Sequence, residues 1–221
     1  MYGVTARVVP VLLARTARAM SWLPFLVAAG FGIAIAAVPA AMSVALSDED
    51  LIRLLRVAAV CGALGVAFLL DDPAARSLAT VPVPRIVRHA VRAALALAAA
   101  GLWWAAVLAI TVGGAEHGVG ATLPLWDASV EAAALAGVGL VCAAVRVRGG
   151  TAGGGTVAAP AVLILAMLLN LLPARLALLV VPGDPRWDAA HERWVALLAF
   201  AAAGLLWAGH EPTRRRRQLW R

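Results

Sequence analysis

Lysine is absent from this chain of 221 residues, and charged residues of every kind make up only 14% of it. All 19 basic residues are therefore arginines, against 12 acidic residues, which gives a formal net charge of +7. Hydrophobic residues account for 63%, so a soluble domain of this composition would lack the polar surface needed to cover its core. The scarcity of charge excludes an ordinary soluble protein and indicates one that lies in a membrane.

The residues that enzymes commonly use for chemistry are also few. The two cysteines, Cys61 and Cys142, lie within apolar runs, which does not favour a disulfide or a metal site. The four histidines are scattered along the chain instead of standing at metal-ligand spacing. The stretch RGGTAGGGT at 148–156 lacks the lysine and the preceding strand of a phosphate-binding loop, and we interpret it as a flexible loop. We expect no metal, no cofactor and no enzyme active site in this chain.

Six apolar segments are each close to the roughly 20 residues that a helix needs to cross a membrane. They are predicted at 22–46, 51–70, 93–112, 128–145, 157–181 and 194–208. The sequence thus predicts an all-α integral membrane protein, in which one transmembrane domain over 1–221 is a bundle of six helices. Ser47 and the acids at 48–50 mark the start of the second helix. These acids are also expected to neutralise Arg53 and Arg56.

Arginines gather at alternate ends of these segments. The N-terminus, the second and fourth connections and the C-terminus together hold 14 of them, whereas the other three connections hold four. Because arginines favour the cytoplasmic side, both termini are predicted to be cytoplasmic. This orientation accounts for the positive charge, so nucleic acid is not an expected partner. The residues expected at lipid or at the membrane interface are Arg7, Arg15, Arg18, Arg88, Arg92, Arg214 and Arg215.

The most polar internal stretch is FLLDDPAARSLATVPVPRIVRHAVR, at 68–92. Asp72 followed by Pro73 is a typical helix start, and Pro82 and Pro84 then end any helix that begins there. A helical pattern with a basic stripe resumes at Arg85. Attraction to anionic lipid explains the basic stripe. A protein partner explains the two acids better, because acids gain nothing at an anionic surface.

This stretch and the six-helix topology resemble the permease subunits of type-two ATP-binding-cassette (ABC) exporters, and the stretch is similar to the corresponding loop of small actinobacterial permeases. The resemblance implies an elbow helix at 3–20 on the inner membrane surface and a coupling loop at 71–92 that contacts a cytoplasmic ATPase subunit. The coupling residues that it implies are Asp72, Pro73, Ala75, Arg76, Leu78, Pro84 and Arg85. The family's larger members have a longer outer segment than the 182–194 stretch of this chain.

The same resemblance implies a function. It implies that a pair of permease chains, identical or paralogous, exports a compound and so confers multidrug or antibiotic resistance. The apolar spans, which have almost no acidic residues, favour an amphipathic or hydrophobic cargo such as a peptide antibiotic, a drug or a lipid. ATP and Mg²⁺ are bound by the partner ATPase and not by this chain. The abundance of alanine, glycine and arginine indicates a GC-rich bacterium, so the expected location is the bacterial cell membrane. The alternative is a non-transporting immunity, assembly or scaffold protein whose basic loops bind lipid or a partner protein.

Arg175 is the one arginine that lies well inside a predicted span. A charge at the centre of a membrane helix costs at least about 2.5–3.5 kcal/mol, so it pairs, lines water or reaches the interface. One interpretation is that Arg175 extends to the outer interface. The other is that it lines a translocation pathway together with Asn170, with Glu131 or Glu192 as its ionic partner.

Overall fold

The computed structural model describes residues 13–44, 46–71, 85–115, 119–149 and 153–210. Within these ranges the chain is helical and has no β-strand, which confirms the all-α prediction. The helices are α2 (Trp22–Ala41), α3 (Asp48–Val66), α4 (Arg85–Gly114), α5 (Val119–Thr122), α6 (Leu125–Arg148), α7 (Gly154–Asn170) and α8 (Trp187–Gly209), with a 3-10 turn, η1, at Ala174–Leu176. A short helical segment at 13–18 precedes α2.

Each of the six predicted apolar segments coincides with one long helix. Ser47 caps α3, because its hydroxyl oxygen accepts a hydrogen bond from the N–H of Asp50 at 3.2 Å. The fifth segment differs most from the prediction, since α7 ends at Asn170. Pro173 follows closely, and proline both lacks an N–H and disfavours a helical conformation in the residue before it. The stretch 171–186 is consequently irregular apart from η1.

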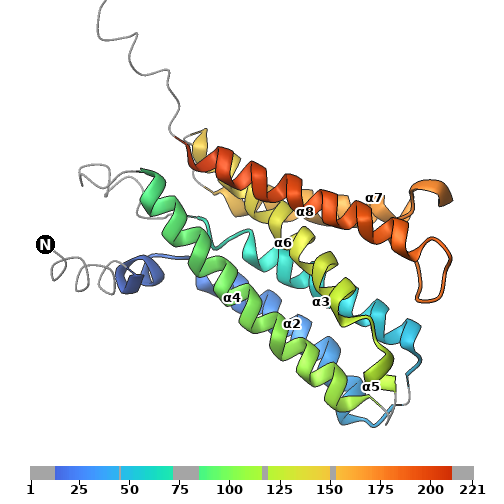
Figure 1. Cartoon of the computed structure of the whole chain (residues 1–221). Helices are drawn as coiled ribbons and strands as arrows, with labels where there is room; N and C mark the ends of the chain where they lie inside the picture. The colour runs from blue at the N-terminus through green and yellow to red at the C-terminus, as the bar shows by residue number, and fades with distance from the viewer. Residues whose placement is uncertain (1–12, 45, 72–84, 116–118, 150–152, 211–221) are drawn as a thin grey trace, which may run out of the picture.

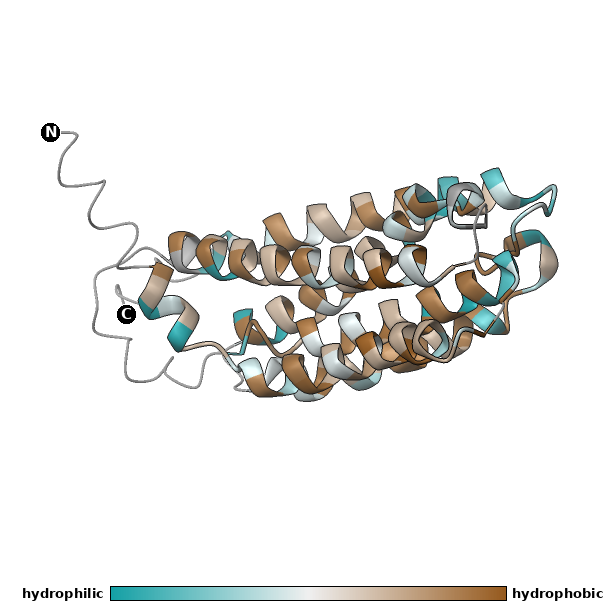
Figure 2. Ribbon diagram, turned by 90° about the horizontal axis from the view of Figure 1, so that it is seen from below, coloured by the Kyte–Doolittle hydropathy of each residue, from teal (hydrophilic) through white to brown (hydrophobic). Residues whose placement is uncertain are grey.

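Four helical segments are long and apolar enough to cross a membrane: α2, residues His89–Gly114 of α4, α6 and α8. Their outward faces carry large, strongly exposed apolar side chains, among them Leu102 and Phe200. Figure 2 shows apolar residues along the middle of the bundle and hydrophilic ones gathered toward its ends. These features are those of a multi-pass membrane protein. The other two long helices are less typical, because α3 begins with charged residues and α7 is shorter.

The six long helices run alternately up and down, so the bundle has two ends (Figure 1). One end brings together Asp71, the starts of α4 and α7, and the ends of α6 and α8. It also carries most of the described arginines, and we call it the arginine-rich end: Arg15, Arg18, Arg85, Arg88, Arg92, Arg146 and Arg148.

The opposite end joins α2 to α3, α4 to α6 and α7 to α8. All of the described acidic residues except Asp71 lie there, and we call it the acid-rich end: Asp48, Glu49, Asp50, Asp127, Glu131, Asp184, Asp188 and Glu192. Five arginines accompany them: Arg53, Arg56, Arg175, Arg186 and Arg193. The segregation of charge along the sequence therefore becomes a segregation between the two ends of the bundle.

Helices α3 and α6 occupy the centre of the bundle. α3 packs against α2, α4, α6 and α7, and α6 packs against α3, α7 and α8. The indole of Trp103 on α4 enters a slot between Gly32 on α2 and Gly62 on α3, where a Cβ atom on either glycine would collide with the ring. Trp103 Nε1 donates a hydrogen bond to the carbonyl of Ala29 at 2.9 Å. Small residues thus let three helices close around one large side chain.

Candidate functional site

A buried polar cluster connects the two central helices with α8 at the acid-rich end. Arg56 on α3 donates two hydrogen bonds to Glu131 on α6, from Nε to Oε2 and from Nη2 to Oε1, both at 2.7 Å. His191 on α8 approaches the same carboxylate, with Nε2 3.1 Å from Oε1. Only 3% of the Glu131 side chain and 14% of the Arg56 side chain is exposed. We call Arg56, Glu131 and His191 the three-helix cluster.

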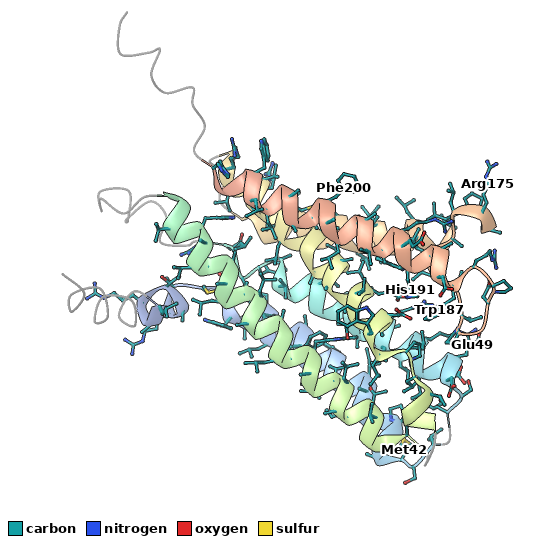
Figure 3. All side chains as sticks on the ribbon, viewed as in Figure 1. Met42, Glu49, Arg175, Trp187, His191 and Phe200 are labelled. Carbon is teal, nitrogen blue, oxygen red and sulfur yellow. The ribbon has the colours of Figure 1, made fainter. Side chains whose placement is uncertain are left out.

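The histidine of this cluster is held on both sides of its ring. Its Nδ1 lies 2.9 Å from the carbonyl oxygen of Trp187, one turn earlier in α8. The Trp187 ring packs on the imidazole with 4.3 Å between centroids, and its Nε1 donates to Asp127 on α6 at 2.8 Å. Figure 3 shows Trp187 and His191 close together on α8. Both ring nitrogens face oxygen acceptors, and only the protonated imidazolium donates from both at once.

A cavity of about 450 Å³ lies beside the three-helix cluster and is lined by α3, α6, α7, α8 and residues 179–181. We call it the polar cavity, because Arg53, Arg56, Glu131 and Asn170 are among its lining residues. Exposure falls from its mouth inward, from 60% at Arg53 to 14% at Arg56 and 3% at Glu131. The rest of the lining is mainly apolar: Val57, Val60, Leu135, Ala166, Leu169, Leu179, Val181 and Trp194.

The predicted pathway residues do not all meet at this cavity. Asn170 and Glu131 both line it, although they are far apart in sequence. Arg175 lies in η1, beyond the end of α7, and its exposed side chain points away from the bundle in Figure 3. Its expected partner Glu131 is paired with Arg56 instead. The expectation that Arg175 lies inside a helical span therefore fails, because α7 is shorter than its apolar run.

The acids at 48–50 neutralise only one of the two nearby arginines. Arg53 forms ion pairs with Glu49 and, at 3.3 Å, with Asp50, as expected. Arg56 does not follow that expectation, because one further turn along α3 turns it toward α6 and its buried acid. The irregular stretch after α7 is held by other arginines. Arg193 donates from Nη1 to the carbonyl of Ala177 at 2.9 Å.

Asp71 organises the arginine-rich end. Its Oδ1 accepts a hydrogen bond from the N–H of Gly155 at 2.9 Å, in the first turn of α7. Burial raises the pKa of Asp71, and the hydrogen bonds from Gly155 and Gly154 together with the charge of Arg92 oppose that rise. The N-terminus of α7 leaves N–H groups unpaired and carries a partial positive charge, so a carboxylate is stabilising there. Asp71 thus joins the end of α3 to the start of α7.

The glycines at the start of α7 are tightly packed. A Cβ on Gly155 would collide with Phe68, and one on Gly154 would lie 2.9 Å from the carbonyl oxygen of Ala143. The expectation of a flexible loop over 148–156 therefore fails for Gly154 and Gly155, which are helical and buried. The sequence did not predict the contact between Asp71 and the first turn of α7, because an acid so far from the glycines can be recognised as a helix cap only once the fold is known.

Many of the predicted coupling and interface residues fall outside the described ranges. These are Asp72, Pro73, Ala75, Arg76, Leu78, Pro84, Arg7, Arg214 and Arg215. Arg85 and Arg88 belong to the first turn of α4. Arg15 and Arg18 are exposed beside the helical segment at 13–18. Arg92 differs from the prediction of lipid contact, because it is buried and its charge acts on Asp71.

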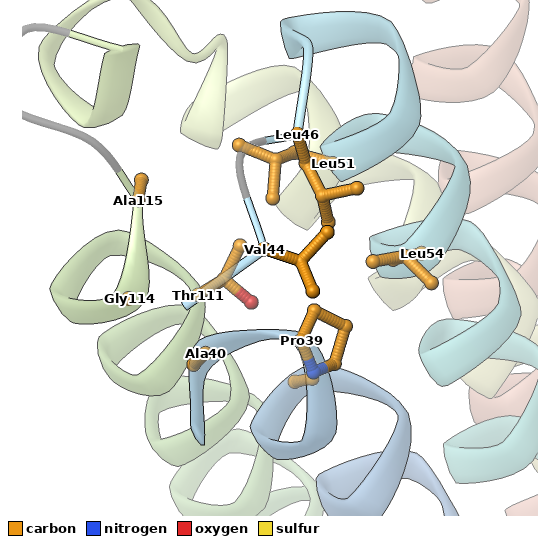
Figure 4. Close-up of a pocket in the computed structure, with 10 residues that line it drawn as sticks. Pro39, Ala40, Val44, Leu46, Leu51, Leu54, Thr111, Gly114 and Ala115 are labelled. Carbon is orange, nitrogen blue, oxygen red and sulfur yellow. The ribbon is translucent and has the colours of Figure 1, made fainter. Parts of the chain in front are cut away.

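Two further cavities are apolar. One of about 310 Å³ lies between α3, α4, α6 and α8 and is lined largely by alanine and glycine, with Trp103, Trp104 and Ser129 on its wall. We call it the apolar cavity. Figure 4 shows the other, of about 10 Å³, where Pro39 and Val44 face Leu54 and Thr111 at the acid-rich end. The small one has room for little more than a water molecule.

The described residues contain no group of three histidine, cysteine or acidic side chains placed to hold a metal ion. Both cysteines are free thiols. Comparisons of the chain with protein-family models, with curated proteins and with solved structures found no match. The features that bear on function are the charge of the two ends, the connection between α3 and α4, and the cavities.

Proposed function

We propose that this chain is the permease subunit of an ABC exporter in a bacterial cell membrane. Two permease chains, identical or paralogous, form the pathway, and separate cytoplasmic ATPase subunits bind ATP and Mg²⁺ and drive transport. The observation that carries the proposal is that α3 ends and α4 begins at the arginine-rich end of the bundle. The 72–84 connection joins these two helices, and Asp71, the residue that precedes the connection, is hydrogen-bonded to α7.

The charge of the two ends supports this orientation. Arginine favours the cytoplasmic side of a membrane. Most of the described arginines lie at one end of the bundle, so the opposite, acid-rich end faces outward. The arginine-rich end then meets the cytoplasm, where an ATPase subunit is available. This orientation also puts residues 13–18, the described part of the proposed elbow at 3–20, on the inner side, as the predicted cytoplasmic location of both termini requires.

The packing supports a role for the 72–84 connection in coupling. A displacement of this connection acts directly on the end of α3 and on the start of α4. Because Asp71 also accepts a hydrogen bond from Gly155, the same displacement acts on α7. α3 is one of the two central helices, so its movement alters the walls of both larger cavities. A push at one end of the bundle is therefore transmitted to the spaces available for cargo.

The nature of the cavities supports an amphipathic or hydrophobic cargo. The apolar cavity, between α3, α4, α6 and α8, has almost wholly apolar walls. The polar cavity combines a charged mouth with an apolar wall. Both volumes lie within the roughly 300–1,000 Å³ that is typical of ligand pockets. A sugar or an inorganic ion gains little from walls of this kind.

Affinity purification from the native host in a mild detergent tests this proposal. We expect an ATPase subunit to co-purify in about equal amount with the permease. The test variant exchanges two charges in the connection, Asp72→Arg with Arg76→Glu, and should lose the ATPase. The control exchanges a matched pair at the opposite end, Asp184→Arg with Arg186→Glu, and should retain it.

The alternative function predicts a different result. A non-transporting immunity, assembly or scaffold protein would be purified without an ATPase, or with one that is retained in the 72/76 variant as well as in the control. Either result, obtained with intact protein, overturns the permease proposal and leaves lipid or partner binding as the better account.

A further inference from the structure

The polar cavity has more arginine than the packing of the bundle requires. Glu131 is neutralised by Arg56, and His191 adds a second donor to the same carboxylate. Arg53 nevertheless stands one turn nearer the mouth and also lines the cavity. Counted over its lining residues, two arginines and one glutamate, the cavity has a formal charge of +1.

Arg56 keeps hydrogen-bond donors for a ligand. It uses Nε and Nη2 to bind Glu131, and within the described residues Nη1 has no hydrogen-bond partner. In the same part of the chain, no fully buried side-chain nitrogen or oxygen is left without a partner. Nη1 is therefore not fully buried, and Arg56 is one of the residues that line the cavity.

Arg53 is free to turn toward a ligand at small cost. Its pairs with Glu49 and Asp50 are on the protein surface, where 60% of its side chain is exposed. Surface ion pairs of this type contribute little, with a median of about 0–1 kcal/mol. A guanidinium that reaches an anion in a less exposed position forms a stronger, charge-assisted hydrogen bond.

The rest of the lining and the volume of the cavity suit an apolar chain. Apart from the two arginines, Glu131 and Asn170, the wall is apolar, formed by side chains such as Val57, Leu135 and Leu169. On the scale at which one water molecule needs about 10–15 Å³, about 450 Å³ has room for a few tens of water-sized groups. A carboxylate with a single chain of about twelve carbons therefore fits this space.

We propose that the polar cavity binds a single-chain anionic amphiphile. Its carboxylate or phosphate head group lies between Arg53 and Arg56, and its tail runs along Val57, Leu135 and Leu169. The inference deepens the proposed function and rests on it in one respect, because it names this class of compound as the exported cargo. The binding itself requires only this chain.

A photo-crosslinking measurement tests the proposal. The full-length protein is placed in nanodiscs of phosphatidylcholine, without an ATPase, and titrated with a diazirine derivative of dodecanoate. Mass spectrometry then locates the adducts. We expect saturable labelling of the lining segments of α3, α6 and α7, and competition by unlabelled dodecanoate but not by dodecylamine or dodecanol.

Three variants separate head-group recognition from general affinity for lipid. Arg53→Gln should weaken binding about tenfold, the effect of losing a charge-assisted hydrogen bond. Arg53→Lys, which keeps the charge, should retain most of the binding. Arg175→Gln removes an exposed arginine at the same end that does not line the cavity, and should leave binding unchanged. Arg53 is exposed, so none of these changes threatens the fold.

Three outcomes would overturn the proposal: labelling spread evenly over the lipid-facing helices, equal competition by dodecylamine, or equal loss in Arg53→Gln and Arg175→Gln. Competition by phosphatidylglycerol but not by dodecanoate would instead identify the cavity as a site for membrane lipid, and would also overturn a single-chain ligand. Because no ATPase is present, failure here leaves the ATPase co-purification result intact, so the two proposals fail separately.

Discussion

Replacing Glu131 with glutamine should destabilise the bundle strongly. The substitution keeps the shape of the side chain and one acceptor oxygen but leaves the charge of Arg56 without its buried partner. Removing one partner of a buried ion pair costs roughly 3–5 kcal/mol. Arg56 is 14% exposed and lines the polar cavity, so water relieves part of the charge and we expect the lower end, about 3 kcal/mol. For a chain of this size that corresponds to a fall of about 6–12 °C in Tm.

Thermal unfolding in detergent, followed by tryptophan fluorescence, measures this effect. Arg53→Gln is the matched control, because the ion pairs of Arg53 are exposed and its loss should cost less than about 1 kcal/mol. In a double-mutant cycle, Arg56→Gln and Glu131→Gln together should cost less than the sum of the two single changes by about 2 kcal/mol. If Glu131→Gln were no more harmful than Arg53→Gln, the three-helix cluster would not hold α3 to α6.

Three other substitutions test separate parts of the structure. Burial raises the pKa of Asp71, so the folded state binds the carboxyl proton more tightly than the unfolded state does, and the free energy of unfolding falls as the pH rises above the usual aspartate value of 3.8. Asp71→Asn should remove this contribution from the pH dependence of Tm. Gly62→Leu should displace the Trp103 ring and cost about 1–3 kcal/mol of unfolding free energy, measured by denaturant titration. The hydrogen bond from Arg186 lowers the pKa of Asp184 to about 2, so the stabilising contact between these two side chains is fully present above pH 3.8 and is lost only as the pH falls through about 2. Asp184→Asn removes the charge of this contact at neutral pH, and should therefore speed tryptic cleavage of the turn that precedes α8.

The helices were predictable because their signals are local. The apolar runs indicated all six long helices, and Ser47 with the following acids marked the start of α3. The apolar run at 157–181 was misleading, since apolar residues continue through the irregular stretch after Asn170. Hydrophobicity records burial or contact with lipid, which helices and irregular segments share, so it does not by itself locate a helix end. Pro173 was the available signal for that end.

The three-helix cluster was not predictable in the same way. Arg56 and Glu131 are 75 residues apart, and nothing in the sequence between them records that α3 and α6 pack together. Pairing Arg56 with the acids at 48–50 was the natural choice from spacing alone. The contact between Asp71 and Gly155 was missed for the same reason. Contacts of this kind depend on how helices meet, which the pattern of one helix does not encode.

In the proposed permease, the 72–84 connection contacts a cytoplasmic ATPase. Site-specific photo-crosslinking in living cells of the native host tests it most directly, with benzoylphenylalanine in place of Leu78 in the connection or of Leu176 in η1, at the acid-rich end. We expect a crosslink to an ATPase subunit from position 78 and none from position 176. Absence of that crosslink from position 78, or its appearance from position 176, would contradict the coupling role, the orientation, or both.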